Sequence, residues 1–114
     1  MNKNIKLDDE QLRLEIHFYR DNHMPAIMAF DEDGSLYGTL TTNLNKHIPK
    51  AISIRSDEVH YRNALIDNRW IKEETIYEQP SGFISIQYYE LTDDAYDAVL
   101  DAAKTQGIEY PINW

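Results

Sequence analysis

The chain has four histidines, the side chains best suited to bind a metal ion or to transfer a proton near neutral pH. They are His17, His23, His47 and His60. Protein metal sites bring such ligands together at short, regular spacings, for example two histidines four residues apart on a helix. No pair of histidines here has that spacing, and the chain has no cysteine. The sequence therefore predicts no bound metal and no cofactor, and it predicts surface positions for the histidines.

Many of the acidic residues stand as adjacent pairs in polar segments, such as Asp8 with Asp9 and Glu73 with Glu74. Acid–base catalysis needs carboxyl groups in a desolvated cleft that separates their pKa values. Nothing in these pairs indicates such a cleft. The chain also lacks the Gly-x-Ser-x-Gly pattern of serine hydrolases and has no glycine-rich phosphate-binding loop. We predict that the chain is not an enzyme, with an active site built from scattered residues as the alternative.

The segment Asp31-Glu-Asp-Gly34 is similar to the first half of a calcium-binding loop. Such a loop closes with a glutamate at its twelfth position, and the twelfth residue counted from Asp31 is Thr42. A tight turn explains the same residues with fewer requirements, because Gly34 adopts a positive φ without strain. The segment is therefore predicted to close a β-hairpin.

A row of aspartates is the pattern that points most directly to binding. In a helix over residues 93–106, Asp93, Asp94, Asp97 and Asp101 fall on one face, opposite an apolar face. Like charges one turn apart repel each other, and a partner with a basic groove would remove that repulsion. Aromatic residues that interfaces favour follow the helix. The predicted partner-binding residues are Asp94, Asp97, Asp101, Tyr110 and Trp114. A solvated helix face remains the alternative.

The overall charge narrows the class of partner. Asp and Glu total 20 against 11 Lys and Arg, which gives a formal net charge of −9, and the basic residues are scattered. Such a surface repels nucleic-acid phosphates and anionic lipid, so we expect neither as a direct partner. No apolar run approaches the ~20 residues that span a bilayer, and no secretory signal is visible. We expect a cytoplasmic protein with a protein partner, and a homo-oligomer is a further option.

Apolar periodicity predicts a single α+β domain over residues 1–114, with a mainly antiparallel sheet of four to six strands and two helices packed on one face. Strands are expected near 11–19, 24–30, 36–44 and 83–91, with shorter ones at 52–54 and 76–77. Helices are expected near 57–67, capped by Ser56, and 93–106, capped by Thr92 and ended by Gly107. The predicted core is Leu12, Leu14, Ile16, Phe18, Ile27, Leu40, Ile84, Ile86, Val99 and Leu100.

Residues 7–44, with the pattern I-K-L-D-D followed by A-F-D-E-D-G-S-L-Y-G-T-L-T-T-N-L, resemble a family of short uncharacterised acidic proteins carried by mobile elements and phages of gut bacteria. The segment P-S-G-F-I-S-I-Q-Y-Y-E-L, residues 80–91, looks like the closing strand of that family. The helix from Thr92 onward departs from the family pattern. Because accessory genes of mobile elements often encode inhibitors of host defence, the resemblance implies a role of that kind.

Together, these patterns lead to a non-enzymatic acidic protein that inhibits or modulates a host macromolecule, such as a defence or nucleic-acid-handling enzyme. The alternative is a small accessory subunit or a homo-oligomer that assembles through its C-terminal segment, with the charge serving solubility.

Overall fold

The computed structural model describes residues 1–112, which form an α+β fold with antiparallel strand pairing, as predicted. One sheet has four strands in sequence order: β1 (Asn4–Leu7), β2 (Glu10–Phe18), β3 (Pro25–Phe30) and β4 (Leu36–Thr39). A second sheet has three strands in the order β5-β7-β6: β5 (Ala51–Arg55), β6 (Ile71–Ser81) and β7 (Ile84–Leu91). The helices are α1 (Val59–Asp67) and α2 (Asp93–Gln106).

The division into two sheets occurs where the predicted strand 36–44 stops after Thr39. The next residues pass from one sheet to the other. The backbone N–H of Leu40 still donates to Ile27 of β3, whereas that of Thr42 donates to Ser53 of β5, at 2.9 Å. Residues 40–42 therefore bridge the sheets instead of extending β4.

β1 is not among the predicted strands, because its apolar alternation is only two residues long. It pairs with β2 through Ile5↔Leu12, and Ile5 is almost completely buried. Asp8 and Asp9 make the connecting turn, both with positive φ. Aspartate adopts this backbone conformation more readily than most residues, so the acidic pair serves the turn.

The two helices differ in how well local signals define them. α2 has the expected bounds: the Thr92 side chain accepts from the N–H of Ala95, and Gly107 ends the helix with a φ of 68°. The predicted cap of α1 is wrong. Ser56 lies before the helix, whose N-cap residue is Glu58 without a side-chain cap, and the Ser56 hydroxyl instead accepts from the N–H of Ser85 at 3.0 Å.

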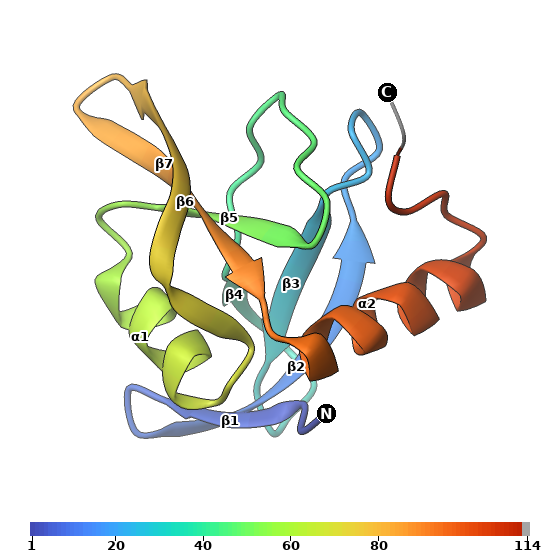
Figure 1. Cartoon of the computed structure of the whole chain (residues 1–114). Helices are drawn as coiled ribbons and strands as arrows, with labels where there is room; N and C mark the ends of the chain where they lie inside the picture. Colours follow the sequence, from blue (N-terminus) through green and yellow to red (C-terminus); the bar gives the residue numbers. More distant parts are fainter. Residues whose placement is uncertain (113–114) are drawn as a thin grey trace.

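Buried residues of both sheets and both helices form the main core, with α2 beside β2 and α1 beside β1 (Figure 1). A smaller second cluster consists of Met24, Ala51, Ile86 and Tyr88. Most of the predicted core is buried, but Phe18, Ile84 and Leu100 are only partly so. The largest fully buried side chains include Trp70, Tyr88 and Tyr89, which were not predicted in the core. The outer half of the β6–β7 hairpin extends away from this body (Figure 1).

Candidate partner-binding surface

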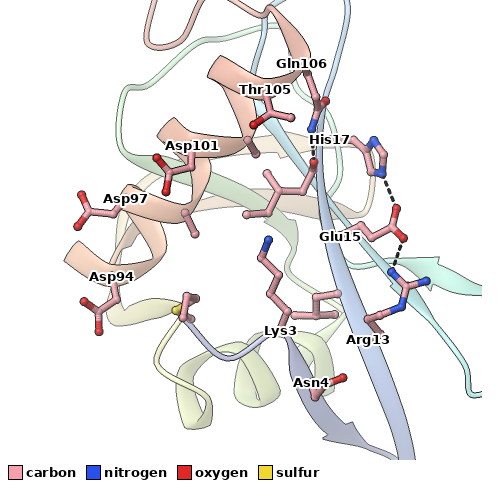
Figure 2. A pocket seen from close by; sticks show the side chains of 15 residues that line it. Lys3, Asn4, Arg13, Glu15, His17, Asp94, Asp97, Asp101, Thr105 and Gln106 are labelled. Atoms are coloured by element: carbon pink, nitrogen blue, oxygen red, sulfur yellow. Dashed lines mark hydrogen bonds and ion pairs between the residues drawn. The ribbon is translucent and has the colours of Figure 1, made fainter.

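The outer face of α2 carries the predicted carboxylates. Ala95, Val99 and Ala103 are buried against the core, which fixes the rotation of the helix. Asp94, Asp97 and Asp101 are exposed as a result. Figure 2 shows the three carboxylates along one side of α2, turned away from β2. The structure thus brings together three of the five predicted partner-binding residues on one exposed surface, which we call the α2 carboxylate face.

Asp93, unlike the three aspartates of this face, is paired with a lysine within the described residues. Its carboxylate accepts a hydrogen bond from Lys50 Nζ at 2.8 Å, and this contact lowers the pKa of Asp93. Within residues 1–112, Asp94, Asp97 and Asp101 have no ion-pair partner. Their charge is therefore available to a basic surface, whereas that of Asp93 is already compensated within the chain.

A groove of about 780 Å³ separates α2 from β2 and the N-terminal segment. The residues along it include Asp94, Asp97 and Asp101, whose carboxylates point to its outer side, apolar residues such as Leu14 and Ala98, and basic residues such as Lys3. Figure 2 shows the Lys3 ammonium directed into the groove. At one end the Gln106 side chain donates to the carbonyl of Ile16 at 2.7 Å, which ties α2 to β2.

The β2 wall of the groove contains a small charged network. Glu15 accepts hydrogen bonds from Arg13 and from His17, the latter at 2.9 Å. These bonds lower the pKa of Glu15, with the Arg13 contact the larger cause. A general acid or base working near neutral pH needs a carboxyl group whose pKa is raised. The network therefore holds Glu15 as a carboxylate and gives it no catalytic advantage.

Tyr110 is not part of the exposed surface, which corrects the prediction for this residue. It is buried, and its hydroxyl accepts from the N–H of Lys50 at 3.0 Å. Its ring lies 5.7 Å from that of Phe18 and 5.6 Å from that of His47. Burial raises the pKa of Tyr110 to about 12. The ring thus belongs to the core, and Trp114 lies outside the described residues.

His47 also differs from its predicted surface position. It is buried, and its Nε2 accepts from the N–H of Ile112 at 3.1 Å, so its Nδ1–H donates to the carbonyl of Asn22 at 2.8 Å. His23 contacts the carbonyl of Glu109 at 2.8 Å. The two histidines therefore hold the segment after α2 in place, a structural role that no short spacing in the sequence signals.

No family model matches the chain, and no curated protein and no solved structure shows significant similarity to it. In the part of the chain that the structure describes, no three His, Asp or Glu side chains converge as a metal site requires, and no helix is long and apolar enough to cross a membrane. The choice of a binding surface therefore rests on the described residues of the chain itself.

One surface feature was not predicted from the sequence. Phe83, expected at the start of a strand, lies instead in the β6–β7 turn with its side chain fully exposed. The available signal was the Pro80-Ser-Gly82 turn sequence immediately before it, because turn chemistry at Gly82 places the next residue at the hairpin tip.

Proposed function

We propose that this chain is a non-enzymatic acidic binding protein whose α2 carboxylate face occupies a cationic groove of a protein partner. The observation that carries the proposal is the exposed charge, unpaired within the described residues, of Asp94, Asp97 and Asp101. All three are exposed, lie on one side of one helix, and have no ion-pair partner within residues 1–112. A row of uncompensated like charges destabilises a helix, and a cationic partner relieves that cost.

The partner class follows from this charge and from the resemblance to proteins of phages and mobile elements. Enzymes that handle nucleic acid bind phosphates with lysine and arginine side chains. A face of carboxylates offers the same charge as the phosphates and competes for the same groove. We therefore propose a phage or mobile-element accessory protein that inhibits or modulates a host defence or nucleic-acid-handling enzyme.

The test begins with a partner isolated from host lysate on the tagged chain and identified by mass spectrometry. Association with the purified partner is then measured for the variant Asp94→Asn, Asp97→Asn, Asp101→Asn. We expect slower association and a weaker dependence on salt, because charge complementarity acts mainly on the association rate. The variant should unfold at nearly the same denaturant concentration, because the relief of like-charge repulsion is offset by the lost interaction of Asp94 with the positive N-terminus of α2.

A matched control removes the same charge elsewhere. Asp9, Glu32 and Asp33 are exposed and lie together at another surface hollow. Their replacement by Asn, Gln and Asn should leave association nearly unchanged. An equally reduced association rate in both triple variants would mean that net charge alone matters. Unchanged binding by the α2 variant would mean that the α2 carboxylate face is only solvated.

A second candidate function is a subunit that assembles through a sheet edge. β6 is an edge strand of its sheet and is exposed along most of its length. Exposed edge strands can pair with a strand of another chain. Light scattering of the purified chain separates this candidate from the first, because assembly of copies raises the mass without any added partner.

A further inference from the structure

Phe83 lies at the tip of the β6–β7 hairpin. This hairpin extends away from the body of the molecule (Figure 1). The relative exposure of Phe83 is 110%, about twice that of the next most exposed large apolar residue, Leu36 at 54%. The ring therefore has no packing role within the described residues. Among the large apolar residues that the structure describes, Phe83 is the most exposed.

The turn does not require an aromatic residue. Gly82 has a φ of +67°, and nothing lies within 4 Å of the place where its Cβ would stand. Two-residue hairpin turns of this kind need glycine at the first position for its backbone freedom, and small polar residues serve well at the second. Phe83 is thus explained neither by the turn nor by the core.

The tip is held firmly by contacts close to Phe83. The N–H of Ser56 donates to the carbonyl of Ser85 at 2.8 Å, and the N–H of Ser85 donates back to the Ser56 hydroxyl. The Glu78 carboxylate accepts from Ser85 Oγ and from Gln87 Nε2 across the two strands. An anchor that is already ordered loses little conformational entropy on binding.

We propose that Phe83 is an anchor residue that inserts into an apolar pocket of a protein partner, with lysine or arginine side chains around that pocket. Aromatic residues on preorganised elements are the side chains that most often dominate binding energy at interfaces. The rim chemistry follows from charge, because Glu78 is exposed on the outer part of β6 and the chain carries a formal net charge of −9. This inference rests on the proposed function and names a second contact element for the same cationic partner.

A second copy of this chain does not fit as the occupant. Two hollows of the described surface are polar, one lined by Asp21, Lys46 and His47 and another by acidic residues. The two hollows beside α2 also hold apolar side chains, such as Leu14 in one and Ile66 in the other. Both of these carry aspartates of α2, which repel the acidic β6–β7 arm of a second copy. Two copies would also each bring a net charge of −9 to the contact. A phosphate-rich surface of nucleic acid or anionic lipid is disfavoured by the same charge.

The test places the photoreactive residue p-benzoylphenylalanine at position 83 of the full chain, irradiates host cells that produce it, and maps the cross-linked peptide. We expect a protein adduct whose cross-linked peptide lies in an apolar pocket bordered by Lys or Arg. Excess wild-type chain should suppress the adduct, whereas Phe83→Ser should need at least about 30-fold more protein for the same suppression. Leu36→Ser, the matched control at another hairpin, should compete like wild type.

The outcomes that overturn the proposal are specific. The first is the absence of an adduct, or an adduct with a second copy, with nucleic acid or with lipid. The second is a cross-linked peptide on a polar surface. The third is equal competition by Phe83→Ser and wild type. Circular dichroism of each competitor shows that loss of competition is not loss of fold.

The same competition separates this proposal from the α2 proposal. If the Asp94→Asn, Asp97→Asn, Asp101→Asn variant competes fully while Phe83→Ser does not, the hairpin anchor stands and the α2 carboxylate face fails. The reverse pattern overturns the anchor and leaves the α2 face supported.

Discussion

The two hairpins at β3–β4 and β6–β7 close with glycine in their turns, yet their tips are built in opposite ways. At the first tip, one oxygen of Asp31 accepts from the N–H groups of Asp33 and Ser35, each at 3.0 Å, and Gly34 has a φ of +83°. At the second, Gly82 supplies the positive φ and Phe83 is directed into solvent. At the first tip, backbone N–H groups are hydrogen-bonded within the turn. At the second tip, an apolar side chain is exposed to solvent.

The difference shows which residues the fold itself requires. Both turns need a residue that tolerates positive φ, and the first also uses a carboxylate to organise its backbone. Neither turn needs an aromatic ring. The composition of the β3–β4 tip is therefore accounted for by folding, while Phe83 at the β6–β7 tip is best explained by a contact outside the chain.

The largest effect on stability is expected at the β3–β4 tip. Asp31→Ala removes the acceptor of two backbone N–H groups, and we expect a loss of about 1 kcal/mol in the free energy of unfolding, since charged acceptors strengthen such bonds. Chemical denaturation measures it. Glu32→Ala is the matched control, with an expected change below about 0.5 kcal/mol because Glu32 is exposed. Equal losses in the two variants would show that Asp31 does not organise the turn.

A smaller, pH-dependent effect is expected at Glu78, below the β6–β7 tip. Hydrogen bonds from Ser85 and Gln87 lower its pKa from the ordinary value of 4.5. Because the folded-state pKa is depressed, the stabilisation is present above about pH 4.5 and is lost as the pH falls through the folded-state value. We expect Glu78→Gln to unfold more readily than wild type at neutral pH and equally in acid.

Denaturant titrations of both proteins across this pH range check the expectation for Glu78. A difference that stays constant from neutral to acidic pH would assign the effect of the substitution to packing. In that case the carboxylate would not hold the strands, and the firmness of the tip would depend on the Ser56–Ser85 contacts alone.

The sequence predicted those features whose determinants lie close together along the chain. The cap at Thr92, the end at Gly107 and the apolar period between them define α2 within sixteen residues, and Asp31 with Gly34 defines the first hairpin turn. The same local pattern placed Asp94, Asp97 and Asp101 on an exposed face.

Features that depend on contacts between distant segments were not predictable in this way. The passage of residues 40–42 between the sheets depends on Ile27 and Ser53, and the burial of His47 depends on Asn22 and Ile112. Phe83 was misplaced for a different reason. Phenylalanine is a strong strand former, so propensity assigns it to a strand unless the adjacent glycine is given the turn.

The smallest effect on stability, and the sharpest test of the comparison, is expected from Phe83→Ser. The ring makes no buried contact in the described structure, so its removal should change the free energy of unfolding by less than about 0.5 kcal/mol. Leu36→Ser should cost more, because Leu36 at 54% exposure still buries part of its side chain. Denaturation of the two variants under identical conditions shows which substitution lowers the free energy of unfolding more. A loss above about 1 kcal/mol for Phe83→Ser would place the ring against the body of the protein in solution, and the contrast between the two hairpin tips would then have a structural cause.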